Sequence, residues 1–534
     1  MDRMSTKPVG IDRTNRRQDL QILTSMQSGK MMPIAYVPLL REDRAQGFLD
    51  VNIEMMETTE LLMNPVRVLV SAYMVPFLAL DRFEGSMDQL NRSYMGQPKV
   101  DGGAVTPFFE TQAYGAYGAN PLYKYLGIHG NSADLMNTTV IEGYNQIWNL
   151  RAKNRSPNLA LRARLDTSLA PAFWPRSRFA HIVPDFDQAR VDGLIALNVV
   201  NSKLPIKGLA NIATQVSAGT NVYKNDGTQE VAVTTAGSRW FNLVGKEKAA
   251  GNFFTDVYAE MSGTAGAISL SNIELAKKTQ AWAKLRERYN EHSDEWLIDM
   301  LMQGLSVPDE SLKRPFLISQ TEATIIQAKR YASTAGQLDA SVTNGMAQAR
   351  VRLSAPQIPT GGIIMVVAEA VPEQLFERQK DVFLSKTAVG QLPDAQRDDL
   401  DPEKVEAVLN SDIDVMHNAP TGVFGYGPLN HWWNAFPPRV GGKFQRPSVD
   451  PATDTVRQRI WAVESANPTL SANFYIVSGI HNKVFINPSQ DPFDVTGSGI
   501  VMVNGLTQFG DALVEATNDY AEVLEKAPTA RIVK

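Results

Sequence analysis

The 534-residue chain contains no cysteine, which excludes disulfide bonds, thiolate metal sites and cysteine nucleophiles. If the folded protein is durable, its stability must come from surface buried within and between subunits. Only six histidines are present, and no two stand three or four residues apart, so no helical zinc pair is predicted.

The chain also lacks an uncharged apolar run of about 18 residues, so no membrane insertion is expected. The nearest run, residues 66–80, contains Arg67 and Pro76 and indicates a strand. The polar segment Met1–Gly10 argues against a signal peptide.

Neither sign of charge dominates, since 52 Lys and Arg face 57 Asp and Glu for a net charge of −5. Contact with nucleic acid would therefore have to be local. Residues 1–30, with little apolar periodicity at their start, are predicted to form an extended N-terminal arm. The basic residues here, our candidates for contact with phosphates, are Arg3, Lys7, Arg13, Arg16, Arg17 and Lys30. A simply solvated terminus is the alternative interpretation.

Alternation of apolar and polar residues predicts several strands. Leu49–Met55 alternates cleanly, and Val66–Val70 repeats the pattern. Met31–Leu40 contains two prolines, which favour an edge position. The unbroken apolar run Ile363–Ala368 is typical of a strand buried on both faces. Toward the end we predict a hairpin around Ser478-Gly479 and a strand at 500–503 before an Asn504-Gly505 turn.

Helical spacing predicts helices at 140–150, from Ser271 after a capping box, and from Ser293 to Gly304. Two more are expected, one opening at Asp401-Pro402-Glu403 and one over residues 512–526. Large insertions are expected at about 84–135, 185–265 and 270–320. The order of strands, insertion, helices and strands favours one β-sandwich domain over residues 31–534.

Standard catalytic and cofactor motifs are missing. The glycines at 422, 425 and 427 precede Pro428 and aromatic residues, which leave no helix N-terminus for a pyrophosphate. The acidic group at 398–403 lacks the central glycine and final glutamate of a calcium loop and is better explained as a solvated helix start. We therefore expect no enzyme activity, no cofactor and no metal site.

Several segments resemble the major capsid proteins of the Microviridae, in particular the gokushovirus-related lineages, in the same order along roughly 450 residues. The most specific is Tyr144-Asn145-Gln146-Ile147-Trp148-Asn149, similar to a Tyr-Asn-x-Ile-Trp-Asn segment of that family. Others are 29–34, 39–56, 66–77, 173–175, 286–289, 293–305, 312–315, 423–426, 438–443 and 468–474; Phe316 replaces an acidic residue of the family pattern.

The resemblance implies a mainly β protein, an eight-stranded jelly roll with long loop insertions and several helices. It implies sixty copies in a T=1 icosahedral shell around circular single-stranded DNA, with the arm of residues 1–30 on the interior side. The implied partners are the chain itself, the DNA genome, small DNA-binding, scaffold or spike proteins of the same phage, and a host receptor. The implied location is the virion, assembled in the bacterial cytoplasm.

Two other classes remain open at this point. A glycan-binding or carbohydrate-active β-sandwich could use Trp432, Trp433 and nearby carboxylates. An accessory spike or decoration protein would share the fold class without forming a closed shell.

Overall fold

A computed structural model gives the fold of the chain. The structure describes residues 10–99, 101–175, 179, 181–185, short strands between 206 and 259, 270–289, 295–305, 308–330, 342–401, 403–434, 436–445, 459–510, 513 and 525. Two compact units divide the chain, one of residues 1–190 with 293–534 and the other of residues 191–292.

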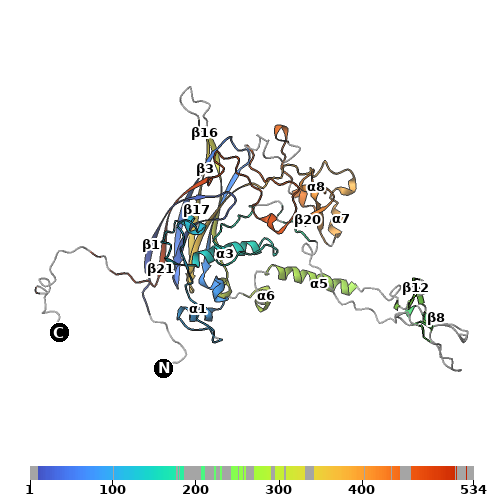
Figure 1. The fold of residues 1–534 in the computed structure, drawn as a ribbon, viewed down its shortest axis with the longest axis horizontal. Coiled ribbons are helices and arrows are strands. Elements are labelled where there is room, and N and C mark those ends of the chain that lie inside the picture. Colours follow the sequence, from blue (N-terminus) through green and yellow to red (C-terminus); the bar gives the residue numbers. More distant parts are fainter. Residues whose placement is uncertain are drawn as a thin grey trace, which may run out of the picture. The chain divides into compact units, whose positions relative to one another are not determined.

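Two antiparallel sheets form the body of the first unit (Figure 1). The five-stranded sheet has the order β1 (Thr14–Met26), β21 (Phe493–Gly505), β3 (Asp43–Thr58), β17 (Val342–Ile358) and β16 (Ile326–Arg330). The four-stranded sheet has the order β15 (Phe316–Thr324), β4 (Val66–Pro76), β18 (Gly362–Pro372) and β2 (Met32–Leu39).

The inward faces of the two sheets share one apolar core. On β3 the alternating residues Leu49, Val51, Ile53 and Met55 are buried in it, while the residues between them point outward. This period of two is why the strand could be predicted from sequence, because one face of β3 meets the core and the other meets solvent.

Strand β18 is buried on both faces. Ile364 and Val366 lie in the core between the sheets, whereas Ile363 and Met365 lie in a second apolar cluster beneath helix α3 (Thr139–Lys153). A strand with apolar neighbours on both sides needs no polar alternation, which accounts for the continuous run in the sequence.

Two long connections carry most of the remaining structure. The first, between β4 and β15, contains η1 (Phe77–Ala79), η2 (Asp81–Phe83), α1 (Met87–Tyr94), β5 (Thr111–Ala113), α2 (Pro121–Leu126), β6 (Leu135–Asn137), α3, α6 (Glu295–Met302) and η4 (Pro308–Leu312). The second, between β18 and β21, contains η6 (Val389–Gln391), α7 (Ala395–Leu400), β19 (Val405–Leu409), α8 (Asn410–Ile413), β20 (Val423–Pro428), α9 (His431–Asn434), η7 (Gly442–Phe444) and η9 (Ala472–Tyr475).

The second unit also falls within the first connection. Its described strands pair β7 (Ile206–Lys207) with β14 (Tyr258–Ala259), β8 (Leu209–Ala210) with β11 (Asn242–Leu243), β9 (Val222–Tyr223) with β10 (Gln229–Glu230), and β12 (Gly245–Ala249) with β13 (Asn252–Thr255). Helix α5 (Leu270–Glu287) follows them. The three predicted insertions therefore belong to one connection, and the second connection was not predicted as an insertion.

Most predicted elements are confirmed, namely the strands at 31–40, 49–55, 66–70, 363–368 and 500–503 and the helices at 140–150, 271 onward and 293–304. The region 84–135 is ordered as expected but includes two short helices. Asn504 and Gly505 belong to β21 instead of a turn. The predicted helix at 512–526 and most of 185–265 lie outside the described residues.

Besides the Asn504-Gly505 turn, two further predictions are wrong. The segment Val405–Leu409 forms β19, where a helix opening at Asp401 is predicted, and the preceding helix α7 starts from the Asp394 cap and ends at Leu400. The hairpin around Ser478-Gly479 does not form, because its two arms bind other segments. The Val477 amide donates to the carbonyl of Ala172, and the Ile486 amide donates to that of Glu57.

Part of the predicted arm is a strand of the sheet. Within residues 1–30, β1 pairs along its whole length with β21, from Thr14 opposite Gly505 to Met26 opposite Phe493. Leu20 and Ile22 pack against the core, which gives β1 a partly buried inward face despite its charged outward one.

The double burial of β18 predicts a large effect of truncating its side chains. We expect Ile364→Ala, at a fully buried position, to lower the free energy of unfolding by about 2–5 kcal/mol through lost apolar contact and a residual cavity. Guanidinium unfolding followed by circular dichroism measures this change. The matched variant Ile326→Ala, at an exposed position of β16, should change stability by less than about 0.5 kcal/mol. Equal shifts for both variants would contradict the assignment.

Candidate functional site

Of the six basic residues predicted to touch phosphates, the four that the structure describes do not form one cluster. Arg3 and Lys7 lie outside the described residues. Lys30 is half-buried beside β2, where its backbone forms an isolated bridge with Pro171. The other three, Arg13, Arg16 and Arg17, lie at or on the start of the edge strand β1.

Arg16 is used within the fold. Its guanidinium forms a salt bridge with Asp43, a carboxylate that is fully buried. Asp43 also accepts a hydrogen bond of 2.7 Å from the Leu40 amide, so it closes the turn between β2 and β3. Arg16 therefore ties β1 to this turn and has little capacity left for a phosphate.

Arg13 and Arg17 remain exposed. Arg13 donates a hydrogen bond of 2.8 Å to the side chain of Asn504 and another to the carbonyl of Glu42. Arg17 forms a 2.7 Å salt bridge with Asp19, and both side chains are well exposed. An exposed pair of this kind contributes little to stability, so Arg17 can exchange its partner at small cost.

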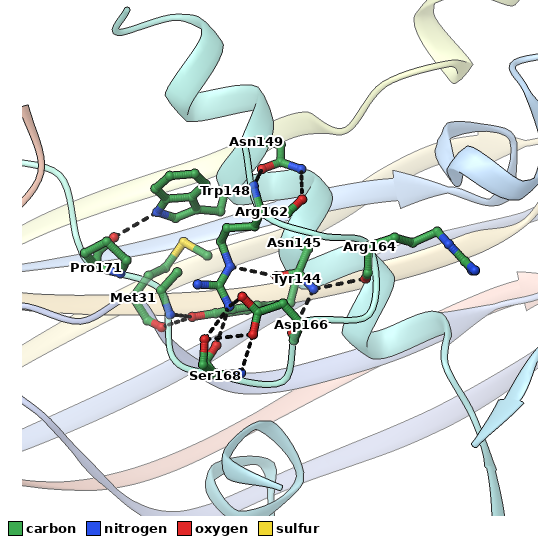
Figure 2. Close-up of polar contacts among 11 residues, drawn as sticks. Met31, Tyr144, Asn145, Trp148, Asn149, Arg162, Arg164, Asp166, Ser168 and Pro171 are labelled. Atoms are coloured by element: carbon green, nitrogen blue, oxygen red, sulfur yellow. Dashed lines mark hydrogen bonds and ion pairs between the residues drawn. The ribbon is translucent and has the colours of Figure 1, made fainter. Parts of the chain in front are cut away.

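The segment that carries the most specific family resemblance forms a polar network on α3 (Figure 2). The Tyr144 hydroxyl donates to the carbonyl of Met31 at 2.5 Å and accepts from the amide of Ala170 at 2.9 Å. The Trp148 indole donates to the carbonyl of Pro171 at 2.9 Å. Burial raises the pKa of the Tyr144 hydroxyl, which keeps it neutral and able to donate.

Two asparagines one helical turn apart hold the loop that follows the helix (Figure 2). The Asn145 amide group donates to the carbonyls of Arg164 and Asp166 at 3.0 and 2.8 Å. Asn149 donates to the carbonyl of Arg162 at 3.0 Å and accepts from its amide at 2.8 Å. Because this loop has no strand or helix partner for its backbone, side chains of α3 supply the hydrogen bonds.

Ion pairs complete the attachment of α3. Glu142 is fully buried, and its carboxylate oxygens lie 2.8 Å from a guanidinium nitrogen of Arg82 and 3.3 Å from one of Arg164. At the other end of the helix, Arg151 makes a two-pronged contact with Glu369 of β18, at 2.5 and 2.8 Å. Each of these carboxylates faces an arginine, an arrangement suited to holding elements together.

Glu110 belongs to the same cluster. It forms a salt bridge with Arg164, and the hydrogen bond from that guanidinium lowers the pKa of the Glu110 carboxyl. Acid–base catalysis would need a carboxyl whose pKa is raised toward neutrality, which is the opposite shift.

The tryptophans considered for sugar binding do not form one platform. Trp432 packs edge-on against Phe179, with 6.1 Å between the ring centres, in the apolar cluster that joins the two connections. The ring centres of Trp433 and Phe383 are 6.5 Å apart. A cavity of about 670 Å³ lies nearby in the second connection and is lined by residues that include Arg378, Asp381, Met416, Arg439 and Phe444.

No family model matches the sequence, and no curated protein matches it. The described residues include no group of three or more histidine, aspartate or glutamate side chains placed to hold a metal ion. No described helix has the length and apolar character needed to cross a membrane.

Sequence reasoning identified the apolar side of α3 but missed the role of its polar side. The partners of Asn145 and Asn149 lie 13–21 residues away in a loop without periodicity. Asn145 and Asn149 stand four residues apart and therefore on one side of the helix. This spacing of two amide side chains was the signal in the sequence for a polar attachment.

The network predicts that one hydroxyl is important for stability. We expect Tyr144→Phe to lower the free energy of unfolding by about 1–3 kcal/mol, because two buried backbone groups lose their partner. Thermal or chemical unfolding of the purified chain measures the change. In the control Tyr117→Phe the lost hydroxyl is exposed, and among the described residues it bonds to the side chain of His129. Its effect should stay below about 0.5 kcal/mol, and a comparable loss there would contradict the prediction.

Proposed function

We propose that this chain is the major capsid protein of a small single-stranded-DNA phage related to the Microviridae. Sixty copies would assemble into a T=1 icosahedral shell around a circular genome. In this proposal the protein is structural, acts in the virion after assembly in the bacterial cytoplasm, and has no enzyme activity.

The observation that carries the proposal is the nested pairing of the strands. β15 and β16 are separated only by Ile325 and count as one strand that passes from one sheet to the other, which gives eight strands in chain order. The first then pairs with the eighth, the second with the seventh, the third with the sixth and the fourth with the fifth. This is the pattern expected of a long hairpin rolled into two facing sheets, a jelly roll.

The long connections support a role in assembly. A shell subunit needs contact surfaces that differ from one neighbour to the next, since contacts around a closed shell are heterologous as well as two-fold. Loops carried on a rigid sandwich can supply such surfaces without altering the core. Both long connections here contain ordered, packed structure.

Exposed apolar side chains on the second connection fit this role. Leu384 and Val389 are 79% and 85% exposed, and Phe383 and Leu400 are also exposed. Exposed apolar side chains on a folded connection can become buried against a partner. In the proposal the partner is a neighbouring subunit, and scaffold, spike or small DNA-binding proteins and a host receptor use other surfaces.

The glycan-binding alternative has weaker support. Trp432 takes part in apolar packing, and neither Trp432 nor Trp433 lines the cavity of the second connection.

Assembly is the direct test. We expect the chain expressed in bacteria, alone or with its neighbouring phage genes, to form uniform closed particles. Sixty chains of 58.8 kDa give a particle mass of about 3.5 MDa, which mass photometry and negative-stain microscopy can measure. A chain that stays monomeric under every condition and joins no particle would contradict the proposal.

Substituting the exposed apolar residues of the second connection should block assembly without unfolding the subunit. We expect Leu384→Asp with Val389→Asp to leave the unfolding midpoint nearly unchanged, because both side chains are exposed in the subunit. Particle yield should fall at least tenfold, because a buried unpaired carboxylate opposes contact by more than about 1.4 kcal/mol. Gln97→Asp with Gln112→Asp adds the same charge at exposed glutamines. An equal loss in that control would point to net charge as the cause.

A further inference from the structure

The outward face of the five-stranded sheet carries apolar side chains that the described residues leave partly uncovered. Phe48, Ile500 and Met502 are 40%, 36% and 43% exposed. Phe48 of β3 lies directly opposite Ile500 of β21, and Met502 follows two residues along the same face of β21. The three therefore form a single patch at the centre of the sheet.

Arginines from three strands surround this patch. Arg17 of β1 pairs in register with Met502, and Arg352 of β17 pairs with Phe48. Arg44 lies four residues before Phe48 on the same face of β3, opposite Asn504. In the described part of the chain, neither Arg44 nor Arg352 has an ion-pair partner, so two guanidinium groups remain available for an external anion.

A fourth arginine, Arg350, places its planar guanidinium over the Phe48 ring. The Arg350 guanidinium lies 4.8 Å from the centre of the Phe48 ring, and Asp50 holds it through two hydrogen bonds of 2.6 and 2.7 Å. The hydrogen bond from Arg350 lowers the pKa of Asp50, which keeps this carboxylate charged. The stacked ring and guanidinium are thus fixed before any ligand arrives, which reduces the entropy lost on binding.

The charge of this face differs from one half to the other. The half around Phe48 contains four arginines and, in Asp19 and Asp50, two carboxylates, for a net charge of +2. The other half contains Glu54 opposite Asp494, two negative charges. A positive half-face on a chain of net charge −5 is a local feature.

We propose that this surface, the Phe48 platform, binds single-stranded DNA without sequence preference. The platform comprises Arg17, Arg44, Phe48, Arg350, Arg352, Ile500 and Met502. Unpaired guanidinium groups match backbone phosphates, and the exposed ring with its stacked guanidinium matches the flat faces of unpaired bases. A duplex keeps its base faces inside the stack and would use only the phosphate contacts.

The identity of the nucleic acid as DNA depends on the proposed capsid function, whereas the binding surface does not. In a shell, the platform must face inward. The platform differs from the nucleic-acid site predicted from sequence, because it lies on the five-stranded sheet. Of the six basic residues predicted there, it includes only Arg17.

Fluorescence anisotropy of a labelled oligothymidylate with the purified full-length chain, at several salt concentrations, tests the platform. For Arg44→Gln with Arg352→Gln we expect weaker binding and a salt slope smaller by about 1.4, the value for two lost phosphate contacts on a single strand. Lys153→Gln with Lys483→Gln removes the same charge from exposed sites elsewhere and should leave binding unchanged.

Substitution of the ring tests the stacking contact separately. Phe48→Ala should weaken binding by about 5- to 150-fold, the loss expected for one stacked base, whereas Phe48→Tyr should retain it. A thermal melt of each variant shows whether the sheet stays folded.

Three results would overturn the platform. These are equal binding of single-stranded and duplex DNA, equal effects of the arginine and lysine variants, and no binding by the unaltered chain. Particle mass is measured on the same proteins. Normal particles without platform-dependent binding would refute the platform alone, and platform-dependent binding without particles would refute the capsid proposal alone.

Discussion

The burial of β18 on both faces is the constraint on which the other layers of the first unit depend. One face completes the core between the two sheets, and the other supports α3 and the first connection. A strand in this position cannot tolerate a polar side chain on either side without a partner. Its one buried charge, Glu369, is matched by Arg151 from the helix above it. The sandwich and the α3 part of the first connection therefore form one packed body within the first unit, in which loss of one layer would expose the next.

Polar groups in this body are satisfied mostly across long sequence distances. The turn after β2 is closed by a carboxylate that binds Arg16, and the loop after α3 is held by the side chains of that helix. Such attachments fix irregular segments without regular secondary structure, which suits a protein whose loops must keep a defined shape. The outward face of the five-stranded sheet is different, because its charges are distributed unevenly. Among the described residues, Arg44 and Arg352 on this face have no ion-pair partner.

The sequence predicted elements whose environment is uniform along their length. β3 and β18 each meet one kind of surroundings on each face, so their patterns could be read directly. β1 was interpreted as an arm because its outward residues are charged and its inward ones only half-buried. β17 was missed although Val351 and Leu353 alternate with Arg350 and Arg352, because small residues fill the rest of its inward face. The partners of α3 and the platform depend on strand register and loop placement, which no local pattern contains.

The pairing of β1 with β21 has a consequence for how the protein is made. β1 leaves the ribosome about 480 residues before its partner β21. At synthesis rates of about 5–20 residues per second, β1 waits roughly 25–100 s before that partner exists. Until then the edge of β3 that will receive β21 is also open, and such edges readily pair with other chains. Completion of the five-stranded sheet is therefore a late event in synthesis, and both edges stay open to other chains until β21 is made.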